Sequence, residues 1–113
     1  MKTGRLWINK KVDAGSGFAL AVMQVLPFNA TLEQWFMNFQ SLPVFTDKII
    51  ITKISALGLV YNIDLIQREA ATMGGKNIIC TEKWEFKKGD SLSVFFANQD
   101  NIGVSFECVF SEK

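Results

Sequence analysis

Hydrophobic and polar residues alternate over three segments of this chain. In 102–110 every second residue is apolar, while most of the residues between them are small or polar. The same period of two runs through 57–65 and through 92–96. Because successive side chains of a strand point to opposite faces, this period is typical of a strand that buries one face. We therefore predict a β-strand at each segment.

Five further segments are short and rich in β-branched or aromatic residues, which favour strands. They are 5–12, 18–26, 48–54, 77–81 and 83–86. Between the strands lie groups of glycine, aspartate, asparagine and lysine that suit tight turns, at 13–17, 73–76, 87–90 and 98–101. The last turn is short enough to close a hairpin.

The segment 31–40 fits two structures. Read as a helix, it has apolar residues at helical spacing, namely Leu32, Trp35, Phe36 and Phe39. Read as a strand, it has one apolar face made of Trp35, Met37 and Phe39. We expect a strand, because so short a helix would need a docking face in a chain that is otherwise sheet.

About eight short strands, with no long helical stretch to connect parallel ones, predict an all-β fold. The expected architecture is an antiparallel two-sheet β-sandwich that is jelly-roll-like. A length of 113 residues suits one core, so we expect a single domain over residues 1–113. With 49% hydrophobic residues the chain can fill that core without disulfides or a metal.

The charge balance excludes several partners. Twelve Lys and Arg against 11 Asp and Glu give a net charge of +1, which produces no long-range field for nucleic acid or anionic lipid. The longest apolar stretch, 18–28, is interrupted by Gln24 and Pro27 and is too short to span a bilayer. Asp13 before it and a poor cleavage site argue against a secretory signal. We expect neither nucleic acid nor a membrane as partner.

Cys80 and Cys108 both fall in apolar, strand-like runs. A buried free cysteine behaves as a small hydrophobic residue, and two cysteines do not make a disulfide framework. We expect free thiols. A bridge stays open if the two strands prove adjacent.

Candidate catalytic chemistry is sparse. The chain has no histidine, which removes the commonest general base and the commonest metal ligand. Glu82 and Glu85 have an odd spacing that would place them on opposite faces of a strand. Asp90, Asp100 and Asn101 would at best form a calcium site in a loop, and solvated turn residues are the plainer interpretation. We expect no enzyme, no cofactor and no metal.

Aromatic residues are in surplus: ten Phe and three Trp accompany one Tyr. Trp7 and Phe95 are out of phase with the apolar residues around them, which would point them away from the core. The segment 18–25 is apolar on both faces. Either a loop of the same chain or a neighbouring subunit must cover this surface, and our hypothesis is a homo-oligomer.

The run Phe86–Val94, FKKGDSLSV, is followed by the polar turn 98–101. This sequence of strand and turn resembles small β-sandwich virion proteins of tailed phages, and 49–66 fits the same pattern. The likeness covers about the last two-thirds of the chain. It implies a non-enzymatic virion subunit that decorates a capsid or forms part of a head fibre or tail, usually as a trimer or in a larger symmetric array, with the trimer favoured. The implied partners are copies of itself and a capsid or tail protein.

Two sets of residues follow from these hypotheses. For a virion interface we expect Trp7, Phe28, Phe45 and Phe95. The alternative is a secreted or cell-surface carbohydrate-binding module, with an aromatic platform made of Trp35, Tyr61 and Trp84, or of Trp7. The virion hypothesis is favoured because surfaces for polar ligands prefer Tyr and Trp, whereas this chain concentrates its aromatic residues in Phe.

Overall fold

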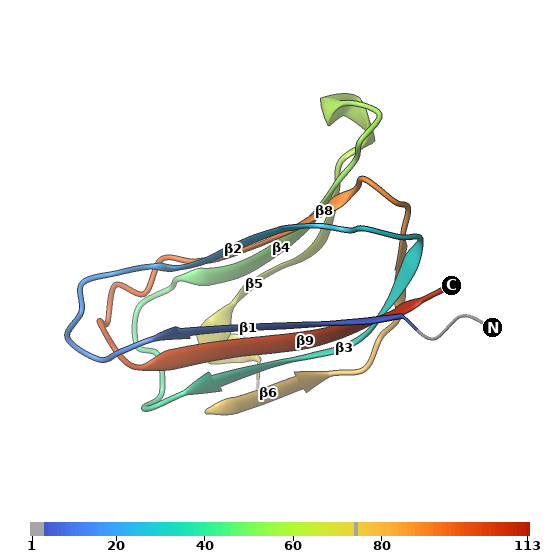
Figure 1. The fold of residues 1–113 in the computed structure, drawn as a ribbon. Coiled ribbons are helices and arrows are strands. Elements are labelled where there is room, and N and C mark those ends of the chain that lie inside the picture. Colours follow the sequence, from blue (N-terminus) through green and yellow to red (C-terminus); the bar gives the residue numbers. More distant parts are fainter. Residues whose placement is uncertain (1–3, 74) are drawn as a thin grey trace.

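The computed structural model describes residues 4–73 and 75–113, which form two antiparallel sheets that pack face to face (Figure 1). The first, called the β1 sheet, contains in spatial order β1 (Arg5–Val12), β9 (Val104–Glu112), β3 (Ala30–Phe39) and β6 (Asn77–Cys80), with β7 (Trp84–Phe86) also paired to β3. The second, called the β2 sheet, has the order β2 (Leu20–Val25), β8 (Ser91–Phe96), β4 (Lys48–Ile54) and β5 (Ile63–Glu69). Two short 3₁₀ turns are η1 (Leu59–Tyr61) and η2 (Ala70–Thr72).

The chain crosses between the sheets at most connections. In the described part, only the β4–β5 and β6–β7 connections stay within one sheet. An eight-stranded double sheet with this interleaved order is a jelly roll, in which β6 and β7 together occupy the place of one strand. The predicted all-β, antiparallel sandwich is thus confirmed, and the predicted bounds 5–12 and 48–54 match β1 and β4.

The core lies between the two sheets. In β9 the even-numbered residues from Val104 to Phe110 are buried, as the alternation predicted. Phe110 meets Phe86 edge to face with ring centroids 5.1 Å apart, a preferred geometry for aromatic pairs. Five of the ten phenylalanines are buried in this core. Much of the aromatic surplus is therefore interior packing.

Segment 30–39 is a strand, as expected, and a β-bulge explains why it also resembles a helix. The pairing of β3 with β9 shifts between Leu32 and Gln34, so Glu33 is an extra residue. The shift lets Leu32 and Trp35 both face the core, a spacing of three that imitates a helical turn. Glu33 points outward, where hydrogen bonds from Lys83 and Ser111 lower the pKa of its carboxyl.

The predicted strand 57–65 is wrong over most of its length. Ordered pairing of β4 with β5 ends at Lys53 and Ile63, and the chain between them forms an exposed loop containing η1. Gly58 has a φ of 131°, a conformation that L side chains rarely adopt and that interrupts an extended strand. The alternation of apolar residues there reflects no buried sheet face.

The predicted hairpin at 98–101 is also wrong. β8 lies between β2 and β4, and β9 lies between β1 and β3, so the turn carries the chain from one sheet to the other. Asn98 and Asn101 both have positive φ, at 59° and 54°. The Asn98 side chain donates to the carbonyls of Phe18 and Ile102, at 3.3 and 3.0 Å. The predicted turn 73–76 includes residue 74, which lies outside the described residues.

Both cysteines are free, as expected. Trp35 of β3 is paired with Cys80 on one side and with Cys108 on the other, so one strand separates the two thiols. Two strand spacings amount to about 10 Å, beyond the reach of a disulfide. Cys108 is fully buried, and desolvation raises the pKa of its thiol from 9.0 to about 12.

The raised pKa predicts a loss of stability at alkaline pH. Above about pH 9 the Cys108 thiol is ionised in the unfolded chain but stays protonated in the folded chain. The free energy of unfolding should therefore decrease as the pH rises from about 9 to about 12. The Cys108 contribution is at most about 1.4 kcal/mol for each pH unit. Urea denaturation of a Cys108→Ala variant over this range should lack that component, whereas Cys80→Ala should keep it. Equal pH slopes for the two variants would contradict the assignment.

Candidate interaction surfaces

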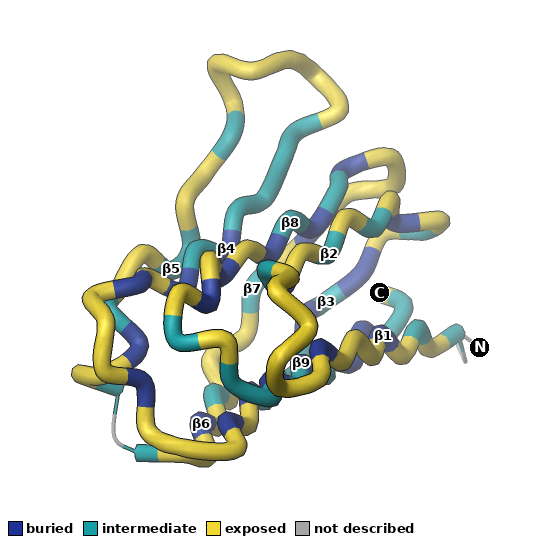
Figure 2. The backbone as a smooth tube through the Cα atoms, turned by 90° about the vertical axis from the view of Figure 1, so that its left-hand side faces the viewer, coloured by how far each residue is buried: buried dark blue, intermediate teal, exposed yellow. Residues whose placement is uncertain are grey.

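The loop between β4 and β5 projects well beyond the sandwich (Figure 1). We call residues 55–63 the apolar arm. Its large apolar side chains are 49–87% exposed, and they are Leu57, Leu59, Val60, Tyr61 and Ile63. No charged residue occurs between Lys53 and Asp64. The tube in Figure 2 is exposed along nearly the whole tip of this arm, which is therefore the most prominent apolar projection of the described chain.

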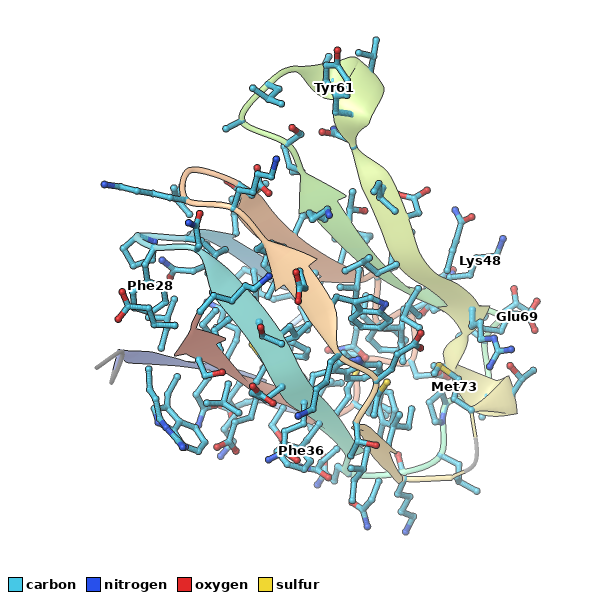
Figure 3. The ribbon with its side chains drawn as sticks, turned by 90° about the vertical axis from the view of Figure 1, so that its right-hand side faces the viewer. Phe28, Phe36, Lys48, Tyr61, Glu69 and Met73 are labelled. Carbon is cyan, nitrogen blue, oxygen red and sulfur yellow. The ribbon has the colours of Figure 1, made fainter. Side chains whose placement is uncertain are left out.

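The backbone of the arm has its own hydrogen bonds. The N–H groups of Tyr61 and Asn62 donate to the carbonyls of Gly58 and Leu59, both at 3.1 Å. The Asn62 side chain accepts from the Ser55 N–H at 2.8 Å and so closes the base of the loop. Tyr61 lies at the tip (Figure 3). The arm is thus held by several hydrogen bonds of its own and presents apolar side chains outward.

Asp90, in the turn between β7 and β8, holds the base of the arm. Its Oδ1 accepts from the Ala56 N–H at 3.1 Å, and its Oδ2 accepts from the Lys87 N–H at 2.9 Å. Asp90 is buried, so both contacts are shielded from water. Gly89 approaches Ala56 closely, since a Cβ added at Gly89 would lie 3.3 Å from the Ala56 Cβ. The neighbouring turn therefore fixes how the arm leaves the sandwich.

The two aspartates considered for a calcium site in a loop lie far apart in the fold. Asp100 lies at the other end of β8, where its Oδ2 accepts from the N–H groups of Val44 and Phe45. Asp90 and Asp100 thus belong to different ends of the fold, and each orders backbone in its own loop. Residues 4–73 and 75–113 contain no group of three carboxylate or cysteine ligands suited to a metal ion.

An open groove of about 560 Å³ runs along the base of the arm. Leu57, Tyr61 and Phe86 supply its apolar wall. Its polar groups contact one another: Lys53 Nζ donates to the Glu85 carbonyl at 3.2 Å, and Lys113 forms an ion pair with the Glu85 carboxylate. The groove is therefore a depression at the root of the arm in which Glu85 engages two lysines through its carbonyl and its carboxylate.

The four residues expected at a virion interface lie in different places. Trp7 is exposed on the outer face of the β1 sheet, and Phe95 is 42% exposed on the outer face of the β2 sheet. Phe45 is exposed in the loop between β3 and β4. Phe28 is half-buried, and a Cβ on Gly4 would lie 2.7 Å from its Cε2. The fold does not bring the four together into one patch, and their contact with a partner stays a prediction.

The proposed carbohydrate platform is not assembled either. Trp35 is fully buried beside Phe106, so its assignment to an exposed platform was wrong. The reason is that Trp35 shares one face of β3 with Met37 and Phe39, and this face lies against the core. Trp84 is half-buried against the core, and Tyr61 lies on the arm. Trp7, the remaining candidate, stands on the outer face of a different strand.

The comparisons with known proteins concern the fold. No family model matches this chain, and no curated protein matches its sequence. Among solved structures, a chain in the acidic stable capsid structure of Helicobacter pylori bacteriophage KHP30 is similar, with a TM-score of 0.54 and 10% sequence identity. The match covers 98% of this chain and 90% of that chain. At this identity the likeness concerns the fold alone. The described part of the chain has no helix long and apolar enough to cross a membrane.

Sequence reasoning missed the arm as a surface, although two signals mark it. One is the run of ten residues without charge between Lys53 and Asp64, and the other is Gly58 within that run. The alternation of apolar residues made the segment resemble a half-buried strand. Only the end of the β4–β5 pairing shows that it leaves the sheet.

Loss of the Asp90 carboxylate should loosen the arm. An Asp90→Ala variant leaves the N–H groups of Ala56 and Lys87 without acceptors, which should lower the free energy of unfolding by about 1–3 kcal/mol. Hydrogen exchange at Ala56 should accelerate, and chymotrypsin should cleave the arm faster. Asp100→Ala is the matched control, because it removes a carboxylate that orders the opposite end of the fold. Equal protection of Ala56 in wild type and Asp90→Ala would contradict the anchoring role.

Proposed function

We propose that this chain is a non-enzymatic structural subunit of a virus particle, and that the apolar arm is its main contact surface. The observation that carries the proposal is an ordered, uncharged projection with five exposed large apolar side chains. The fold shared with a phage capsid protein supports the same role. Because a jelly roll hosts many functions, the arm rather than the fold gives the proposal its content.

The energetics favour a partner for the arm. Full burial of a Val, Leu or Ile side chain contributes about 1.5–3 kcal/mol relative to exposure. Several such side chains on one loop would offset the cost of association, which consists of lost rigid-body freedom and side-chain ordering. Since hydrogen bonds already hold the backbone of the arm, the ordering needed on binding is mainly that of its side chains. The partners would be other copies of this chain and a capsid or tail protein.

The same role predicts the oligomeric state, further contact residues and the location of the chain. A trimer is the arrangement that the resemblance to phage decoration proteins implies, and a projecting arm suits a ring, because each copy can place it on the next. Trp7, Phe28, Phe45 and Phe95 would serve as secondary contacts on separate faces. The location of the chain would then be the virion, as a capsid decoration, a head-fibre part or a tail-associated part.

Incorporation into particles tests the role and the arm together. Phage particles purified from the strain that carries the coding sequence should contain the chain at a fixed ratio to the shell protein, measured by quantitative mass spectrometry. A Val60→Asp variant should be incorporated at about one-tenth of the wild-type level or less, because a charge would replace a valine that the proposed contact buries.

Val44→Asp is the matched control for this experiment. Val44 is 83% exposed and Val60 is 87% exposed, but Val44 lies in the loop at the opposite end of β4. Wild-type incorporation of Val44→Asp with loss of Val60→Asp is the expected result. Equal loss of both variants would contradict the arm as the main contact, and absence of the wild-type chain from the particles would contradict the virion role.

A further inference from the structure

One edge of the sandwich lacks the protection that the others have. Exposed edge strands pair readily with other chains unless charge, short length or a bulge prevents it. Among the described strands, five lie at sheet edges, and four of them are protected. β1 carries Arg5, Lys10 and Lys11, and β5 carries charges and a register shift opposite Ile51 and Thr52. β6 and β7, which share one edge, have only four and three residues. β2 has six residues, LAVMQV, with neither a charge nor a proline nor a shift in its pairing with β8.

The backbone of β2 is arranged for a further strand. The Leu26 N–H donates to the Asp90 carbonyl at 2.8 Å. Because hydrogen-bonded and non-hydrogen-bonded residue pairs alternate along an antiparallel ladder, the even-numbered residues of β2 point their N–H and C=O groups toward β8. By alternation, Ala21, Met23 and Val25 direct their N–H and C=O groups toward the open edge. The Gln24 side chain donates to the Val25 carbonyl at 2.8 Å, as expected for an edge group without a strand beside it. Within the described chain, the other edge groups of these three residues have no hydrogen-bond partner.

The side chains next to this edge belong to an uncharged surface. Met23 and Val25 are exposed on the outer face of the β2 sheet. In the next strand Phe95 stands opposite Ala21, and Ser93 stands opposite Met23. In β4, Ile50 and Thr52 follow in the same rows. Across β2, β8 and β4 these rows contain no charged side chain, so a strand added at β2 would extend an uncharged face.

We infer that β2 pairs antiparallel with β2 of a second copy, joining two β2 sheets into one. A two-fold axis places residues near it opposite their own symmetry mates, so a charged strand would oppose like charges. β2 is free of that repulsion, whereas β1, with its three cations, is not. With Met23 on the axis, Ala21 faces Val25 of the partner copy, and all three outward residues find backbone partners.

This inference rests on the proposed role as an assembling subunit and names a contact separate from the arm. It is tested in a Val60→Asp background, in which association through the arm is suppressed. Sedimentation velocity over a concentration series should then show a monomer–dimer equilibrium. Adding Met23→Lys should raise the dimer dissociation constant about tenfold or more, because two like charges meet at the axis. Met23 is exposed, so the variant should fold, and its thermal transition checks this.

Ser93→Lys is the matched control, since it adds the same charge to the same outer face one strand further from the edge. Dimerisation retained in Ser93→Lys and weakened in Met23→Lys is the expected result. Equal weakening of the dimer in both variants would contradict edge pairing and indicate that the two outer sheet faces pack against each other. A Val60→Asp protein that stays monomeric at all concentrations, with its fold intact, would overturn the inference outright.

Hydrogen exchange provides a readout that needs no substitution within β2. Amides of Ala21, Met23 and Val25 should become protected as protein concentration rises, while that of Val22 should be protected throughout by its bond to β8. Concentration-independent exchange at the three odd-numbered amides would contradict the pairing. The incorporation experiment tests the virion role separately. If the chain dimerises through β2 but is missing from the particles, the virion role is wrong and the pairing stands. If the chain is present in the particles but Met23→Lys does not weaken the dimer, the pairing alone is wrong.

Discussion

The structure depends on the burial of two apolar sheet faces against each other. Phe39 of β3 meets Phe96 of β8 across the sandwich, with ring centroids 5.3 Å apart, and both side chains are buried. A strand in either sheet hides its inner face only while the other sheet is present, so the two sheets stabilise each other. The bulge at Glu33 belongs to the same constraint, because it keeps Leu32 and Trp35 on the inner side of one strand.

The apolar side chains that the sandwich leaves exposed determine which surfaces can contact other molecules. Five phenylalanines fill the core, and much of the exposed apolar surface is aliphatic, as in the arm and along β2. The two surfaces differ in kind. The arm offers apolar side chains on a loop that is held by hydrogen bonds of its own, whereas β2 offers open backbone groups and an uncharged face. A subunit with one projecting contact and one self-complementary edge could join neighbours in two independent ways.

Charged groups act locally in this fold. Asp90 and Asp100 each bind two backbone N–H groups in their own loops, and Asp47 accepts from the Gln99 N–H at 2.6 Å. These carboxylates order the connections at both ends of the sandwich, where the backbone leaves the sheets. The arm and β2, by contrast, carry no charged residue.

The sequence by itself determined that the chain is an antiparallel sandwich, because a period of two in β9 and β8 reports directly which face of a strand is buried. It also determined the strands β1 and β4 and the absence of a histidine-based active site. Only the tertiary structure decided that 57–63 leaves the sheet, that Trp35 is interior, and that the 98–101 turn joins different sheets. Alternation in a sequence records the polarity of neighbouring residues, whereas pairing between distant strands decides which segments form a sheet and which edges stay open.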